Sequence, residues 1–220
     1  MKNLTEVVFI LDRSGSMSGL ESDTIGGFNS MIEKQKKSEG EVLISTVLFN
    51  NESFVLHDRV PLNKIQPMTD EDYEVGGSTA LLDAIGDAIK HIKVVHKYAR
   101  EEDRPSKTLF VITTDGQENS STRYSYNDIK KLVEAQQEKE WEFIFLGANI
   151  DAISVAGSMG IRANRAVNYH NDKRGTKKRY EAMSSFFGAA MSARSFADVD
   201  DSWRADLDED FESRKPNDEK

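Results

Sequence analysis

Short runs of apolar and β-branched residues alternate along the chain with longer segments in which apolar residues recur at helical spacing. This alternation predicts an α/β fold, a mostly parallel sheet with helices on both faces. Only Asn50–Glu52 separates the second run from the third, and so short a link favours an antiparallel hairpin over a crossover helix. The predicted strands are Glu6–Leu11, Val42–Phe49, Ser53–Val60, Thr108–Thr113, Glu142–Leu146 and Ala166–Asn168.

The segments between these runs predict helices, because their apolar residues fall on one helical face. Ser125 or Asn127 is suited to cap the third helix, and Ile129 and Val133 would form part of its core face. The prolines and glycines of Leu62–Gly77 favour a long loop there. The predicted helices are Leu20–Lys37, Ala80–Arg100, Tyr126–Glu138, the short Asp151–Met159 and Arg179–Phe196.

The C-terminal segment Asp198–Lys220 differs in composition from the rest of the chain. It holds ten acidic and four basic residues, and thus −6 of the chain's formal net charge of −9. Such a segment is expected to stay a disordered or loosely docked tail, since it has little apolar surface to bury. Trp203, Leu207 and Phe211 leave an alternative open, because their spacing would form one apolar helical stripe. We therefore divide the chain into a domain at 1–197 and an acidic tail at 198–220.

The overall negative charge argues against nucleic acid or an anionic membrane as the main partner, because both need clustered Lys and Arg. The basic residues between Lys173 and Arg179 form such a cluster, but no set of aromatic side chains accompanies it for stacking on bases. This cluster is better interpreted as a solvated helix start or as a dock for the acidic tail.

The chain has no cysteine, which excludes disulfides and thiolate zinc sites and fits a reducing compartment. The first apolar run, Val7–Leu11, is shorter than the core of a signal peptide, and no stretch approaches the roughly 20 apolar residues of a membrane span. We therefore expect a soluble cytoplasmic protein.

Candidate chemistry begins directly after the first predicted strand. Asp12, Ser14 and Ser16 stand at positions i, i+2 and i+4, where a tight turn can converge three oxygens on one hard cation. Thr79 lies in a glycine-rich loop that opens a helix, and Asp115 follows the apolar strand at 108–113. Carboxyl ends of parallel strands meet in one crevice, so these residues are expected to come together. Taken alone, Asp12 and Ser14 would equally suit a helix-capping turn.

These residues resemble the metal-ion-dependent adhesion site of von Willebrand factor A-type domains, built from a D-x-S-x-S loop, a Thr and an Asp. The resemblance spans about Thr5–Asn168 and points to a bacterial or phage intracellular member. It implies a doubly wound, six-stranded sheet in the order 3-2-1-4-5-6, with the third strand antiparallel at the edge. It also implies that Ser14, Ser16 and Thr79 are the more direct ligands, with Asp12 and Asp115 binding the ion directly or through water.

Five such oxygens bring only two formal negative charges to a divalent ion. Mg²⁺ or Mn²⁺ prefers six oxygens and commonly keeps water, so one position should stay open for an Asp or Glu carboxylate of a protein partner. We therefore predict a cation-dependent protein-binding module, an adaptor or assembly factor and not an enzyme. By analogy with the family, the partner is an ATPase or a stress-response protein, and the acidic tail is a candidate to ligate the ion itself.

The alternative is a metal-dependent phosphohydrolase with Asp12 as nucleophile. A phosphatase of the haloacid-dehalogenase type would need a second Asp two residues later, where Ser14 stands. The sequence also lacks a phosphate-binding G-x-x-x-x-G-K-[ST] motif and any apparent Ser/His/Asp or Cys/His set. Glu118, close after Asp115, is a candidate for a water-mediated contact with the ion, or else merely solvates its loop.

Overall fold

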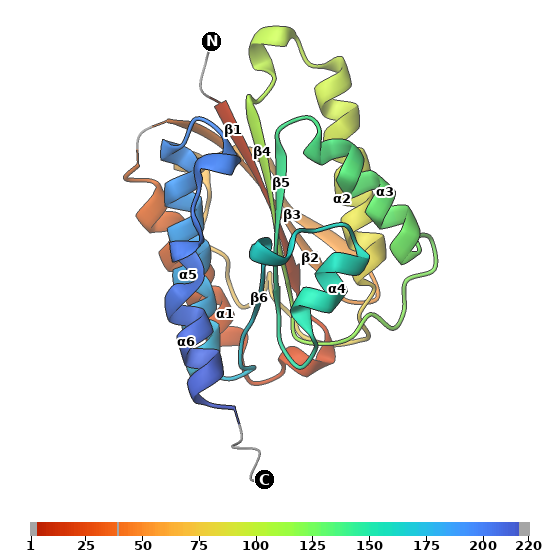
Figure 1. The fold of residues 1–220 in the computed structure, drawn as a ribbon, viewed down its shortest axis with the longest axis vertical. Helices are drawn as coiled ribbons and strands as arrows, with labels where there is room; N and C mark the ends of the chain where they lie inside the picture. The colour runs from red at the N-terminus through yellow and green to blue at the C-terminus, as the bar shows by residue number, and fades with distance from the viewer. Residues whose placement is uncertain (1–3, 39, 216–220) are drawn as a thin grey trace.

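The computed structural model describes residues 4–38 and 40–215, and a six-stranded sheet forms its centre (Figure 1). The strands are β1 (Leu4–Asp12), β2 (Glu41–Phe49), β3 (Ser53–Pro61), β4 (Lys107–Thr114), β5 (Trp141–Gly147) and β6 (Ala166–Asn168). Their order is β3-β2-β1-β4-β5-β6, as the family resemblance implies. All neighbouring pairs are parallel except β2 and β3, which confirms the antiparallel hairpin predicted from the short link.

The strand register places the loops after β1, β2 and β4 at the same end of the sheet. Asp12 pairs with Phe49 on β2, and Leu11 pairs with Thr113 on β4. Every residue of β1 and β4 is buried, because these central strands are covered on both faces. The polar residues that follow them therefore leave the core side by side.

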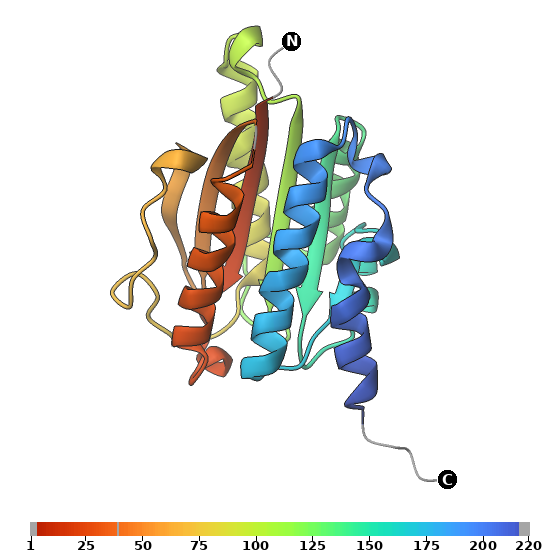
Figure 2. The same cartoon turned by 90° about the vertical axis from the view of Figure 1, so that its left-hand side faces the viewer.

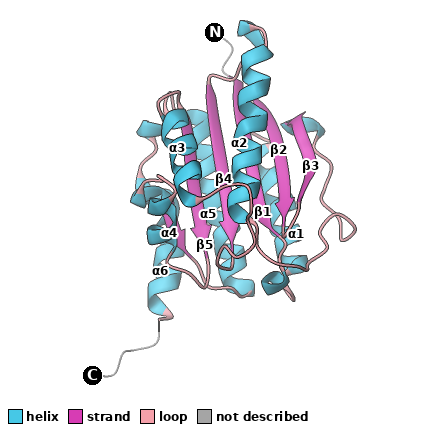
Figure 3. Cartoon of the chain, turned by 90° about the vertical axis from the view of Figure 1, so that its right-hand side faces the viewer, coloured by secondary structure: helices cyan, strands magenta, loops and turns pink. Residues whose placement is uncertain are grey.

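Helices cover both faces of the sheet. Those of the described residues are α1 (Glu21–Gln35), α2 (Leu81–Tyr98), α3 (Tyr126–Gln137), α4 (Ala152–Ser158), α5 (Lys173–Ser192) and α6 (Ala205–Ser213). Short 3-10 turns lie at η1 (Gly15–Met17), η2 (Leu62–Lys64), η3 (Glu101–Asp103), η4 (Ala163–Arg165), η5 (Phe196–Asp198) and η6 (Asp201–Arg204). Helices α1, α5 and α6 lie on one face (Figure 2) and α2, α3 and α4 on the other (Figure 3). In the described parts of the chain, no helix has both the length and the hydropathy to cross a bilayer.

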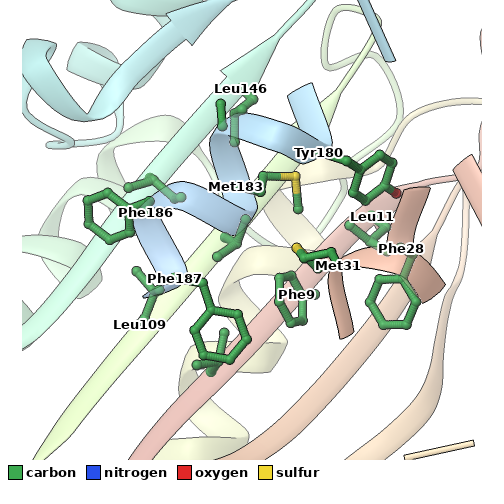
Figure 4. Close-up of a cluster of buried hydrophobic side chains, with 14 of the residues drawn as sticks. Phe9, Leu11, Phe28, Met31, Leu109, Leu146, Tyr180, Met183, Phe186 and Phe187 are labelled. Carbon is green, nitrogen blue, oxygen red and sulfur yellow. The ribbon is translucent and has the colours of Figure 1, made fainter. Parts of the chain in front are cut away.

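The sheet separates two apolar cores, as the alternation of side chains along a strand requires. On β1, Phe9 belongs to the core under α1 and α5, whereas Ile10 belongs to the core under α2 and α3. The ring of Phe9 packs edge-on against Phe28 of α1, with 5.6 Å between the ring centroids, and against Phe187 of α5 at 6.2 Å (Figure 4). These contacts fix the position of β1, from whose end the Asp12 loop departs.

Helix α5 begins earlier than the sequence predicts. It starts at Lys173 instead of Arg179, because the side chain of Asp172 caps it by accepting a hydrogen bond of 2.8 Å from the amide of Gly175. The first turn is polar, so the apolar spacing that marks a helix is absent there. Its end at Ser192 also precedes the predicted Phe196, which lies in the turn η5.

The prediction of a disordered tail is wrong as far as the structure describes the tail, which is to Lys215. Trp203 and Leu207 are only 4% and 1% exposed, and Trp203 packs edge-on against Phe186 of α5. The alternative apolar stripe is therefore the better description, although Phe211 is only partly buried. Acidic residues do not prevent this packing, because several of them pair with cations, as Asp208 does with Arg204. Asp218 and Glu219 lie outside the described residues.

Candidate metal centre

The first loop of the site is folded around the carboxylate of Asp12, the last residue of β1. The amide of Ser14 donates a hydrogen bond of 2.7 Å to Asp12 Oδ1, and the hydroxyl of Thr114 donates one of 2.6 Å to Asp12 Oδ2. Tyr73 donates to the backbone carbonyl of the same residue. Asp12 is only 2% exposed, so these donors replace the water that a free carboxylate would bind.

The serine hydroxyls connect this loop to the end of β4. Ser14 Oγ lies 3.1 Å from Ser16 Oγ, and Ser16 Oγ donates a hydrogen bond of 2.6 Å to Asp115 Oδ1. Asp115 is 1% exposed and follows β4 directly. The structure thus brings together four of the five residues that the sequence predicts, as one chain of neighbouring oxygens.

Thr79 reaches the same place from the loop before α2. The backbones of the two loops are joined, since the amide of Gly15 donates to the carbonyl of Gly77 at 3.0 Å. Gly77 has a φ of +76°, a conformation that favours glycine. A methyl group added at Gly116 would lie 3.5 Å from Ser16 Oγ and 3.8 Å from Thr79 Oγ1. Both hydroxyls therefore line one small space, and the fifth predicted residue belongs to the group.

Glu118 and Asn119 hold the Thr79 loop. Asn119 Oδ1 accepts the amide of Thr79 at 2.9 Å, and Glu118 accepts the amide of Leu82 at 3.0 Å at the start of α2. The other oxygen of Glu118 accepts the amide of Ser121. Both carboxylate oxygens of Glu118 are thus engaged in structural hydrogen bonds, so its predicted water-mediated contact with an ion has no support in the geometry.

The electrostatics of the site favour a cation. Burial raises the pKa of Asp12 above its ordinary value, although the hydrogen bonds from Ser14 and Thr114 oppose the shift. Burial is also the main cause that raises the pKa of Asp115; the hydrogen bond from Ser16 opposes this shift and the negative charge of Asp12 adds to it. Two buried carboxylates that repel each other are stabilised by a positive ion placed between them.

A fully buried arginine lies beneath the site. Arg179 donates a hydrogen bond of 2.8 Å to the hydroxyl of Tyr169, which in turn donates to the carbonyl of Thr114 at 3.2 Å. Its guanidinium lies 4.9 Å and 4.8 Å from the ring centroids of Tyr169 and Tyr180. Its positive charge is one of the influences that lower the pKa of Asp115. Grouping Arg179 with the solvated basic cluster was therefore wrong.

The other basic residues of that cluster agree with the predicted dock for the acidic tail. Arg174 lies 2.5 Å from Asp210, and Lys178 lies 4.0 Å from Asp206, both on α6. Arg179 faces inward because it falls on the same helical face as the buried residues Thr176 and Met183.

Sequence reasoning missed Thr114 and Asn171. Asn171 Nδ2 donates a hydrogen bond of 2.8 Å to Asp115 Oδ2 from the loop after β6. Thr114 directly precedes Asp115 at the end of β4, and that position was the available signal. Asn171 follows a parallel strand of the same sheet, so the predicted topology already placed it at the correct end.

The donor set suits a hard divalent ion. It consists of two carboxylates and three hydroxyls, all of them oxygen donors, as Mg²⁺ and Mn²⁺ prefer. Within 4–38 and 40–215, no group of three or more His, Asp or Glu side chains forms a metal-binding cluster. A metal at this place would therefore depend on the hydroxyls of Ser14, Ser16 and Thr79 as well as on the two carboxylates.

Comparisons with known proteins agree with this architecture. A protein-family model described as the von Willebrand factor type A domain matches residues 6–174. Von Willebrand factor type A from Catenulispora acidiphila is similar in structure, with a TM-score of 0.56 at 12% identity over 86% of this chain and 43% of that one. Proximal thread matrix protein 1 from the mussel byssus, with a zinc-occupied MIDAS motif, gives 0.56 at 12% identity over 83% and 45%.

The VWA domain of SpRpn10 gives a TM-score of 0.54 at 11% identity over 82% of this chain and 95% of that one. A comparison with curated proteins gave no match. Identities this low show a shared fold. The chain spans less than half the length of the Catenulispora and mussel proteins, so their properties as whole proteins do not transfer to it.

Proposed function

Because the chain belongs to the von Willebrand factor type A domain family, whose members typically mediate protein–protein interaction, we propose that it is a divalent-cation-dependent protein-binding module. The observation that carries the proposal is the continuous set of oxygens from Asp12 to Asp115, linked through Ser14 and Ser16 with Thr79 beside them. Domains of this family commonly bind a divalent metal at such a place.

In the proposed site, Mg²⁺ or Mn²⁺ is bound by Ser14, Ser16 and Thr79, with Asp12 and Asp115 binding directly or through water. The metal acts as a Lewis acid that attracts an anionic oxygen. The two carboxylates cancel its charge only formally, and Arg179 adds one buried positive charge nearby. An Asp or Glu carboxylate of a partner protein is the ligand that best fits this balance.

We further propose that the protein works as a cytoplasmic adaptor or assembly factor of bacterial or phage type, beside an ATPase or a stress-response protein. The absence of cysteine supports a reducing compartment. Ligation of the ion by the protein's own tail is also part of the proposal, through Asp218 and Glu219, because several other tail carboxylates already pair with cations.

We propose no enzymatic role. The geometry argues against Asp12 as a nucleophile, because its two oxygens accept hydrogen bonds from the Ser14 amide and the Thr114 hydroxyl. A nucleophilic carboxylate needs one oxygen free to approach phosphorus. Turnover of a simple phosphate ester that disappears in Asp12→Asn would restore the phosphohydrolase.

The test is a pull-down from native lysate with Mg²⁺ or with chelator. We expect the wild type to retain a partner only with Mg²⁺, and Asp12→Ala to retain it under neither condition. Asp103→Ala is the matched control, because it removes an exposed carboxylate from the turn before β4, at the other end of the sheet. Capture that survives both chelator and Asp12→Ala would remove the metal from the mechanism.

A further inference from the structure

A fourth loop, between β6 and α5, reaches the site described above. Its Asn171 donates from Nδ2 to Asp115 Oδ2 at 2.8 Å and to the carbonyl of Ser16 at 3.4 Å. The other oxygen of Asp115 accepts the Ser16 hydroxyl. Asn171 therefore supplies the hydrogen bond that keeps the Asp115 carboxylate from rotating away from the serine loop.

The carboxamide oxygen of Asn171 is also unusual. It is buried and has no hydrogen-bond partner within the part of the chain that the structure describes. Turning the amide over would place this oxygen against the carboxylate of Asp115, which is unfavourable between two acceptors. The orientation of the side chain is therefore determined by Asp115.

The loop that carries Asn171 is held by the C-terminal helix α6. On one side of Asn171, His170 Nε2 donates to the carbonyl of Phe211 at 3.1 Å, and the two rings lie 4.8 Å apart between centroids. On the other side, Asp172 forms an ion pair with Arg214, whose Nη1 also lies 3.0 Å from Asp210. Both neighbours of Asn171 in sequence are thus fixed by α6.

Helix α6 has an anchor that does not depend on this loop. Trp203 and Leu207 are buried in the core under α5, and Arg165 donates to the carbonyls of Phe196 and Val199 at 3.0 Å each. From there α6 runs to the end of the sheet at which the strand arrowheads lie (Figure 2). Its C-terminal turn is a fixed support placed beside the site.

We propose that Asn171 is a positioning residue for the metal centre, and that α6 holds it in place. The proposal rests on the proposed function, since it assumes that the site binds a divalent ion. Residues outside ordinary ligand positions commonly orient metal ligands in this way, and their loss lowers metal affinity by about 10- to 100-fold. The C-terminal segment thereby becomes part of the binding apparatus.

The experiment measures Mn²⁺ affinity by titration calorimetry and the spectrum of bound Mn²⁺ by electron paramagnetic resonance. We expect Asn171→Ala to weaken binding by about 10-fold and to change the spectrum, because Asp115 no longer has a fixed orientation. Arg214→Ala should act in the same direction and by less. Arg204→Ala is the matched control, since it removes an ion pair of α6 with Asp208 but touches no residue of the Asn171 loop.

A double variant separates positioning from general destabilisation. If α6 acts through Asn171, adding Arg214→Ala to Asn171→Ala causes no further loss of affinity. Additive losses, or an unchanged Mn²⁺ affinity and spectrum in Asn171→Ala, would overturn the inference while leaving the proposed function intact. A wild-type protein that binds no Mn²⁺ would overturn the proposed function, and the inference with it.

Discussion

Single side chains at the strand ends owe their positions to donors that the fold supplies. Thr114 is the example closest to the site, because its hydroxyl serves one oxygen of Asp12 while the Ser14 amide serves the other. A buried carboxylate that loses a donor regains no water in exchange. The behaviour of this pair can therefore be tested by removing one hydroxyl.

Thr114→Val removes that donor while keeping the shape of the side chain. We expect the free energy of unfolding in chelator to fall by about 1–3 kcal/mol, because Asp12 Oδ2 is left unsatisfied. Urea unfolding monitored by circular dichroism measures it. The control is Thr5→Val on β1, where the buried hydroxyl has no partner among the described residues, so the change should be neutral or stabilising. Equal losses in both variants would contradict the hydrogen-bond argument.

Asp83 has a comparable role at the start of α2. Burial alone would raise its pKa, but the amides of Thr122, Arg123 and Tyr124 donate to its carboxylate at 3.0, 2.9 and 3.1 Å and hold the pKa below the ordinary value. A carboxylate with a lowered pKa stabilises the fold at pH values above its unfolded pKa. That contribution is lost as the pH falls through the folded pKa.

We expect Asp83→Asn to lower the free energy of unfolding by about 1–3 kcal/mol at neutral pH. The difference from wild type should shrink only below about pH 4, where the unfolded carboxylate takes up its proton. Urea unfolding as a function of pH measures it. Asp87→Asn, one turn later on α2, is the control, because that half-exposed carboxylate pairs only with side chains at the surface.

Among the elements, the C-terminal segment departs most from its composition. Its net charge predicts solvation, yet η6 and α6 pack on α5. Two large apolar side chains suffice, because burying a residue such as Trp203 outweighs the modest cost of arranging exposed charges. The deciding quantity was the spacing of the apolar residues and not the sum of the charges.

Trp203→Ala tests whether this segment is integral to the fold. We expect a loss of about 3–5 kcal/mol in the free energy of unfolding, as for a large aromatic side chain removed from a core. Phe54→Ala is the control, since that ring on the edge strand β3 is 46% exposed and should contribute little. An unchanged stability in Trp203→Ala would return the segment to the status of a loosely docked tail.

Strands, their order and the five site residues could be predicted because each carries a local signal. Buried parallel strands are continuous apolar runs, and polar residues directly after them mark the ligand-binding end of the sheet. Asn171 and Arg179 carry no such signal. Their roles depend on α5 beginning at Asp172 and on α6 packing beside it, which are tertiary facts. Local patterns therefore indicate the ligands but not the residues that support them.

For the whole molecule, the sheet order explains why one site draws on distant segments. β1 and β4 are neighbours, so the loops after them diverge to opposite faces and leave a crevice between them. The site lies across that crevice. A bound ion therefore links segments that unfold together, and metal binding must stabilise the entire domain.

This linkage gives a measurable expectation. With Mg²⁺ at about 100 times its dissociation constant, the free energy of unfolding should rise by about 2.7 kcal/mol. For a domain of this size the unfolding midpoint should rise by roughly 5–10 °C. Differential scanning calorimetry measures it, and chelator should reverse it. A shift of the same size in Asp12→Ala would mean that Mg²⁺ acts elsewhere on the protein.

The support that α6 gives to the Asn171 loop also has a consequence for the order in which the protein is made. Asp12 is among the first residues to leave the ribosome, whereas Arg214 is among the last. N-terminal segments generally fold first during synthesis, so the sheet can assemble before the site has its final support. A nascent or prematurely terminated chain would thus carry all five predicted ligands but hold Asp115 loosely. Partner capture is then reserved for finished molecules.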